Sequence, residues 1–211
     1  KRLKSPVMQP TGYLENPDIM IIGEAPGETE DLQDRQFVGK SGQLLRNTLR
    51  DNVDTNKIAF DNILACRPPS NRNPTEFEME CCRSRLIKNI LAINPRMIVT
   101  YGAIPLKFFT GKDQIFAWRG RTIPISFGMN SFWISFNLHP SFILRQGGQG
   151  FKDSVDRKFM HAFEMDHRKI NDFLHNNDTL PKVIKGNYRD NVIIYDGSDE
   201  KQLKRLERHL S

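Results

Sequence analysis

The chain has 211 residues, with 31 Lys and Arg, 25 Asp and Glu, and a formal net charge of +6. No run approaches the ~18 consecutive apolar residues of a membrane-spanning helix, and 38% hydrophobic residues suffice to bury a core, which excludes membrane and disordered classes. Three cysteines are too few for a disulfide framework, which favours an intracellular chain. Residues 1–150 carry 19 basic and 14 acidic side chains, an excess that favours nucleic acid as a partner.

Short apolar runs alternate with helical patterns along the first two thirds of the chain. The apolar runs predict strands over residues 18–22, 58–65, 96–101 and 131–137. The helical patterns cover residues 41–49, 76–93 and the segment after Gly102, with Thr75 as the N-cap of the second helix. This alternation predicts an α/β fold with a central, mostly parallel β-sheet and helices on both faces. Ligands of such sheets bind beyond the carboxyl ends of the strands.

The last part of the chain has a different pattern. Residues 151–174 predict one long helix, and residues 176–186 resemble a connector. Beyond it we expect a strand over residues 191–195 and a basic amphipathic helix over residues 199–210. We therefore divide the chain into a main domain, 1–175, and a C-terminal linker with a strand-helix extension, 176–211, which either completes this domain or leads into another.

Residues capable of chemistry gather where the predicted strands end. GEAPGETED (23–31) follows the first strand, NILACRPPSNRNPT (62–75) the second, and NLHPSFILR (137–145) the last. A phosphate-binding loop at Gly39-Lys40-Ser41 is excluded, because Asp34 stands where that pattern needs glycine and no strand leads directly into it.

Together with FVGKSGQLL (37–45) and INPRMIVTYG (93–102), these motifs resemble the uracil-DNA glycosylase superfamily, most closely its iron–sulfur family four. The resemblance runs in order from Ile19 to Arg145, and Arg119-Gly120 matches a further pair before a late strand. It implies the uracil-DNA glycosylase fold and removal of uracil from DNA by base flipping.

The chemistry of that reaction gives each motif a role. The base must leave the stack before its bond to the sugar can be cut. Phe37 is suited to stack on the flipped ring, and Asn62 can match the N3–H and O4 edge of uracil and reject cytosine. His139 can donate a hydrogen bond to the uracil O2 anion as it develops. The loop expected to bind the base on the same side comprises Gly23, Ala25, Pro26 and Gly27.

The resemblance also implies that Glu24 positions or activates the attacking water. A well-known branch of the superfamily has an aspartate where this chain has Ala25, so Glu30 and Asp31 remain alternatives. Outside the family motifs, His139 would be interpreted as a buried core residue, Phe37 as core, and Asn62 as a turn or capping residue.

DNA contacts are expected after the histidine, in the loop that begins with Pro140. One of Ile143 and Leu144 is a candidate apolar wedge into the base stack, and Arg145 is a candidate partner for phosphate. Ser141 completes the proposed DNA-binding set.

The cysteines depart from the family pattern, which implies a 4Fe-4S cluster held by two pairs of cysteines. Cys66 and Cys82 match the second pair of ligands, and the first pair would fall just before Lys1. Because the chain does not start with Met, we expect the missing pair upstream rather than lost. Without a cluster, the two thiols are small buried hydrophobes. Gln36 is a second departure, since relatives usually carry proline there, and it is expected to loosen the loop.

These features favour a DNA repair glycosylase that hydrolyses the N-glycosidic bond of uracil in DNA, with no metal in the chemical step. The first alternative is a catalytically silent DNA-binding module of the same fold, fused to or associated with a replication or repair protein. The second is a glycosylase for another deaminated base, such as hypoxanthine or xanthine. No membrane partner is expected.

Overall fold

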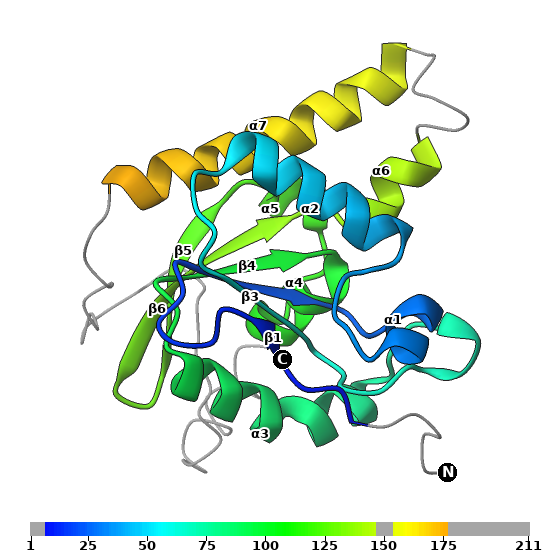
Figure 1. Cartoon of the computed structure of the whole chain (residues 1–211), viewed down its shortest axis with the longest axis vertical. Coiled ribbons are helices and arrows are strands. Elements are labelled where there is room, and N and C mark those ends of the chain that lie inside the picture. Colours follow the sequence, from blue (N-terminus) through cyan, green and yellow to red (C-terminus); the bar gives the residue numbers. More distant parts are fainter. Residues whose placement is uncertain (1–6, 147–153, 177–211) are drawn as a thin grey trace, which may run out of the picture.

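The structure is a computed structural model that describes residues 7–146 and 154–176, and these residues form a six-stranded sheet (Figure 1). The strand order is β1-β3-β2-β4-β6-β5. Strands β3, β2, β4 and β6 run parallel, and the edge strands β1 and β5 are antiparallel to their neighbours. The strands are β1 (Thr11–Gly12), β2 (Ile19–Gly23), β3 (Ile58–Asn62), β4 (Met97–Tyr101), β5 (Thr122–Phe127) and β6 (Asn130–Asn137). This sheet confirms the predicted fold class.

Helices cover both faces of the sheet (Figure 1). They are α1 (Glu28–Gln33), α2 (Lys40–Asn52), α3 (Glu76–Ile93), α4 (Ala103–Thr110), α5 (Ile115–Trp118), α6 (Pro140–Gln146) and α7 (Ser154–Asn176), with a 3-10 turn at Pro69–Asn71. Alternate residues of β2 point to opposite sides, so Met20 and Ile22 pack with α3 and α4 whereas Ile19 and Ile21 pack with α2, α6 and α7. The central strands are therefore buried on both faces, which explains their continuous apolar runs.

Helix α3 begins and ends at the predicted residues. The Oγ1 of Thr75 accepts a hydrogen bond from the Glu78 backbone N–H at 3.2 Å, and the Glu78 carboxylate accepts one from the Thr75 backbone N–H at 2.9 Å. This capping box satisfies two backbone donors that a helix start would otherwise leave unpaired. The helix ends at Asn94, whose φ of 51° lies in the left-handed region.

Several elements differ from the sequence-based expectation. Strand β3 ends at Asn62 rather than at residue 65, although Ile63 and Leu64 remain buried and bond to the backbone oxygens of Gly23 and Glu24. The residues after His139 form helix α6 instead of a loop. Elements β1, α1 and α5 are too short to show a periodic pattern.

The domain division expected after residue 175 falls at the end of α7 and stays a prediction. Residues 177–186 of the expected connector, and the strand and helix expected over residues 191–195 and 199–210, lie outside the described residues. None of the helices within residues 7–146 and 154–176 has the length and apolar character that crossing a membrane requires.

Candidate active site at the carboxyl ends of the parallel strands

The sheet brings the motif residues to one edge. Gly23 at the end of β2 is the register partner of Asn62 at the end of β3, and Tyr101 of β4 is the partner of Asn137 on β6. His139 follows two residues after Asn137, beside the turn that opens α4. Because these strands are parallel, their carboxyl ends and the loops that follow them share this edge.

Glycine is needed at the end of β2, where three segments meet. A Cβ at Gly23 would clash with Oδ1 of Asn62 and would lie 2.8 Å from Cζ of Phe37, closer than atoms can approach. The Phe37 ring and the Asn62 amide therefore both lie close to Gly23. Phe37 is half-buried, and its φ of 55° is unusual for a residue with a side chain.

Two side chains hold the Phe37 loop in this conformation. Arg46 of α2 donates from Nε to the Phe37 backbone oxygen at 2.9 Å, while its guanidinium lies 4.0 Å above the Phe60 ring. Glu30 of α1 accepts from the backbone N–H groups of Val38 and Gly39 at 2.9 and 2.7 Å. One oxygen of this carboxylate, Oε1, therefore satisfies donors at the start of α2 and holds the Phe37 loop.

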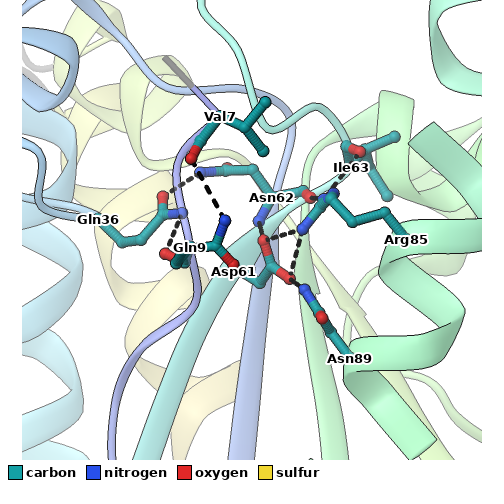
Figure 2. A network of polar contacts seen from close by, with 8 residues as sticks. All are labelled: Val7, Gln9, Gln36, Asp61, Asn62, Ile63, Arg85 and Asn89. Carbon is teal, nitrogen blue, oxygen red and sulfur yellow. Dashed lines mark hydrogen bonds and ion pairs between the residues drawn. The ribbon is translucent and has the colours of Figure 1, made fainter. Parts of the chain in front are cut away.

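Helix α3 fixes the backbone at the end of β3 (Figure 2). The fully buried Asp61 carboxylate accepts from Nη1 of Arg85 at 2.9 Å, from Nδ2 of Asn89 at 2.9 Å and from the Asn62 backbone N–H at 2.7 Å. Nη2 of Arg85 donates to the Asn62 backbone oxygen at 2.5 Å. Sequence analysis missed this network, although Arg85 and Asn89 stand four residues apart on one helix face.

The side chain of Asn62 bonds to an unexpected partner. Its Nδ2 donates to Oε1 of Gln36 at 2.5 Å, and both side chains are buried, at 4% and 0% exposure. Nε2 of Gln36 donates in turn to the backbone oxygen of Gln9 at 3.3 Å. The expectation that Gln36 loosens the loop is therefore wrong, because this residue ties the Phe37 loop to the end of β3.

The surroundings of His139 determine which ring nitrogen carries the proton. The backbone N–H of Ser141 donates to Nδ1 of His139 at 3.1 Å, and the Ser141 hydroxyl lies 2.7 Å from the same nitrogen. A backbone N–H can only donate, so Nδ1 accepts and the neutral ring carries its proton on Nε2. Gly102 allows the ring this position, since a Cβ there would lie 3.3 Å from Cδ2 of His139.

The His139 ring is neutral at physiological pH. Burial, assisted by the positive charge of Arg145, lowers the pKa of His139 to about 4. Arg145 is itself exposed and donates from Nη1 to the Ser141 hydroxyl at 3.1 Å. The arrangement presents an uncharged N–H donor at Nε2.

The loop after β2 holds a carboxylate of raised basicity. Burial raises the pKa of Glu24, and within the described residues no hydrogen bond to its carboxylate is found. Its neighbours are fixed, because Ala25 packs against the core and Pro26 is buried, while Gly27 begins α1. A partly desolvated carboxylate on a rigid loop is suited to orient water.

The two candidate wedges differ in burial. Ile143 is fully buried in the core with residues of α2 and α7, whereas Leu144 is partly exposed on α6. A wedge has to reach the base stack, so the assignment of Ile143 is wrong and Leu144 stays a prediction.

Cys66 and Cys82 lie near one another, Cys66 in the loop after β3 and Cys82 on α3. Burial raises the pKa of the Cys66 thiol, and the neighbouring Cys82 adds to this effect. Residues 7–146 and 154–176 contain no group of three or more His, Cys, Asp or Glu side chains arranged to hold a metal. A four-iron cluster takes four ligands, so these two thiols do not complete such a site within the described chain.

The carboxyl edge of the sheet thus carries an amide, an aromatic ring and a neutral imidazole, on an α/β fold. The family model described as uracil DNA glycosylase superfamily matches residues 10–164. The chain belongs to the uracil DNA glycosylase superfamily, which confirms the resemblance seen in the motifs.

Individual relatives support the same family. A Type-4 uracil-DNA glycosylase of Thermotoga maritima is 38% identical over 128 residues, which cover 60% of this chain and 66% of the relative. One of Pyrobaculum aerophilum is 44% identical over 90 residues, covering 42% and 46%. A DNA polymerase of Bacillus phage SP01 is 29% identical over 130 residues, which cover 61% of this chain and 14% of the polymerase. The chain thus spans less than two thirds of the length of these curated relatives.

Proposed function

We propose that this protein removes uracil from DNA by hydrolysing the bond between the base and its sugar, after the nucleotide has flipped out of the helix. The observation that carries the proposal is His139, whose Nδ1 is occupied by the Ser141 backbone N–H so that Nε2 presents an N–H at the strand-end edge. Membership of the superfamily and the similarity to proteins named Type-4 uracil-DNA glycosylase support it.

Recognition of the base falls to Phe37 and Asn62. The Phe37 ring offers a face for stacking, and the Asn62 amide lies close to the same residue, Gly23. Oδ1 of Asn62 accepts the uracil N3–H, and the second hydrogen of Nδ2 donates to O4. Cytosine has an acceptor at N3 and a donor at position 4, so both groups would be mismatched. Buried mismatches of this kind give strong discrimination.

Bond cleavage leaves the electron pair of the glycosidic bond on uracil and positive charge on the sugar. Nε2–H of His139 donates a hydrogen bond to the uracil O2 as this negative charge grows, and removing one such donor typically costs about 10²–10³ in turnover. Glu24 accepts a hydrogen bond from the water whose oxygen attacks C1′ of the sugar. The products are free uracil and an abasic site.

Contacts with DNA are proposed for the face that carries α6. Leu144 is the apolar side chain that enters the base stack, and Arg145 is a cation that pairs with a backbone phosphate. The similarity to a phage DNA polymerase supports the proposal that a domain of this kind can work within a longer replication protein.

The 4Fe-4S cluster implied by the family resemblance remains a proposal for Cys66 and Cys82, supported by the proximity of their thiols. Its other ligands would have to come from outside the described residues. Iron content and visible absorption of a chain extended upstream, with Cys82→Ser beside it, test this proposal. No chemical step above depends on the cluster.

The proposed activity is tested with a labelled oligonucleotide that contains one uracil, either single-stranded or opposite guanine, followed by alkaline cleavage of abasic sites. Wild type and His161→Ala, an exposed histidine on α7, should cut the strand at equal rates. His139→Ala should lower single-turnover rates by about 10²–10³ without loss of DNA affinity. Equal cleavage by His139→Ala would refute the assigned role. DNA binding by wild type without any scission would favour the silent module.

A further inference from the structure

Gln36 occupies a position that the proposed chemistry does not use. It precedes Phe37, its side chain is fully buried, and Arg46 donates from Nη2 to its backbone oxygen at 3.0 Å. Figure 2 shows its side chain approaching Asn62 from the side opposite to Arg85 and Asn89. A buried amide at this place needs partners for both of its ends, and the structure supplies them.

The two hydrogen bonds of Gln36 have a defined direction. A backbone carbonyl can only accept, so the bond to the Gln9 oxygen at 3.3 Å requires the NH₂ end of Gln36 at that side. The carbonyl end of Gln36 then faces Asn62, and this acceptor requires the NH₂ end of Asn62, 2.5 Å away. The Gln9 carbonyl thus determines the orientation of the Gln36 amide, which in turn determines the orientation of the Asn62 amide.

This chain of bonds leaves one orientation for Asn62. Its Oδ1 lies on the side of Gly23 and Phe37, bordering the space proposed for the base. An asparagine amide is nearly symmetric in shape, so packing alone would accept either orientation, with oxygen and nitrogen exchanged. The exchanged orientation would offer a donor to N3 and an acceptor to position 4, the pattern that matches cytosine.

We propose that Gln36 is a specificity-determining positioning residue, which holds the amide of Asn62 in the orientation that accepts the N3–H of uracil and rejects cytosine. This inference rests on the proposed function and deepens it. Arg46 contributes by holding the Gln36 backbone in place. Gln36 is therefore held at both ends, by Arg46 at its backbone oxygen and by the Gln9 carbonyl at its side chain.

Two kinds of substitution at residue 36 separate positioning from space-filling. Gln36→Met keeps the length of the side chain and removes both polar groups, which frees the Asn62 amide to turn over. Gln36→Glu keeps an acceptor for Nδ2 of Asn62, loses the donor to the Gln9 backbone oxygen and places a carboxylate at a buried position, which costs stability. Gln33→Met, on the exposed face of α1, is the matched control. Gln36→Leu is a second apolar variant, and circular dichroism with thermal melting reports folding of each.

The measurements are kcat/KM for uracil in DNA, residual excision of cytosine, and inhibition by free uracil and free cytosine, all at pH 8. In Gln36→Met and Gln36→Leu, kcat/KM for uracil should fall about tenfold, and the preference of the site for free uracil over free cytosine should narrow by about the same factor. Gln36→Glu should keep the preference of wild type, despite a lower melting temperature. Gln33→Met should match wild type in every readout.

An unchanged uracil preference in the folded apolar variants would overturn the inference, as would a Gln36→Glu variant that loses the preference as fully as Gln36→Met. These outcomes are distinct from failure of the proposed function. If wild type cuts no uracil-containing DNA, the activity fails, while binding of the free bases still decides whether Gln36 sets the preference of Asn62.

Discussion

His139 and His167 share a depressed pKa and differ in every contact that matters for function. Burial lowers the pKa of each ring to about 4, so both are neutral at pH 7. In His167, on α7, Nδ1 lies 2.6 Å from the backbone oxygen of Phe163 and Nε2 lies 2.8 Å from the Tyr101 hydroxyl. A carbonyl only accepts, so Nδ1 of His167 carries the proton and Nε2 accepts from Tyr101.

The two rings are therefore opposite tautomers. His167 uses both nitrogens inside the protein and links α7 to the end of β4. His139 uses only Nδ1, and within the described residues no protein group bonds its Nε2. A low pKa alone does not mark a catalytic histidine, because burial produces it in both. Among the residues that the structure describes, the two histidines differ in whether Nε2 is free of protein partners: it is in His139, whereas in His167 it is bonded to Tyr101.

The largest expected effect is a loss of stability on replacing His167, the histidine whose two ring nitrogens both bond inside the protein. His167→Ala should lower the free energy of unfolding by about 4 kcal/mol, because it leaves a cavity and strands the buried Tyr101 hydroxyl. Urea unfolding measures the change, with His161→Ala as the exposed control on the same helix. Turnover by the folded fraction should stay within about threefold of wild type, since His167 donates nothing to the site. A specific loss of turnover in folded His167→Ala would contradict the conclusion that His167 has only a structural role.

The pH dependence of stability follows from the same lowered pKa. Between pH 6.5 and 4 the unfolded state binds a proton at His167 and the folded state does not, so stability falls as the pH falls. Over this pH range the free energy of unfolding should fall by about 3 kcal/mol because of His167. It is measured as the difference between wild type and His167→Phe in urea unfolding at pH 7.5 and pH 4.5. Equal acid sensitivity in both proteins would show that the ring does not have this pKa.

The sequence predicted parts of the molecule that depend on neighbours in the chain. The bounds of α3 followed from its capping residues, and the strands followed from apolar runs that are buried on both faces. Asn62 and His139 were assigned from the family resemblance of motifs that stand at strand ends, and their roles stay predictions.

Other features depend on partners that are distant in sequence. The burial of Gln36 requires Asn62, 26 residues later, and a backbone oxygen 27 residues earlier. The choice between Ile143 and Leu144 required the orientation of α6 against α2 and α7, because adjacent helical residues point in different directions. Neither relation produces a pattern among neighbouring residues of the sequence, so neither could be predicted from it.

Removing the Ser141 hydroxyl sharpens the account of the His139 tautomer. In Ser141→Ala the backbone N–H still donates to Nδ1, so the proton stays on Nε2 and the loss should be limited to about tenfold in kcat. Single-turnover excision of uracil measures it, with Ser84→Ala, an exposed residue on α3, as the control. A loss as large as that of His139→Ala would mean that the hydroxyl, rather than the backbone, sets the tautomer.

The smallest effect concerns the charge beside the His139 ring. The positive charge of Arg145 disfavours a second positive charge on the imidazole, so Arg145→Met should raise the pKa of His139. Protonation of Nδ1 would break the bond from the Ser141 backbone, and activity should therefore decline at a higher pH on the acid side than in wild type. This shift of the acid limb should be a few tenths of a pH unit, because Arg145 is exposed and its charge is screened by solvent.

The acid limb is measured in single-turnover profiles from pH 4 to 7 on pre-bound DNA, which removes any contribution of Arg145 to affinity. A shift in the opposite direction would mean that the acid limb belongs to another group, and Glu24, whose burial raises its pKa, is then the first to test with Glu24→Gln.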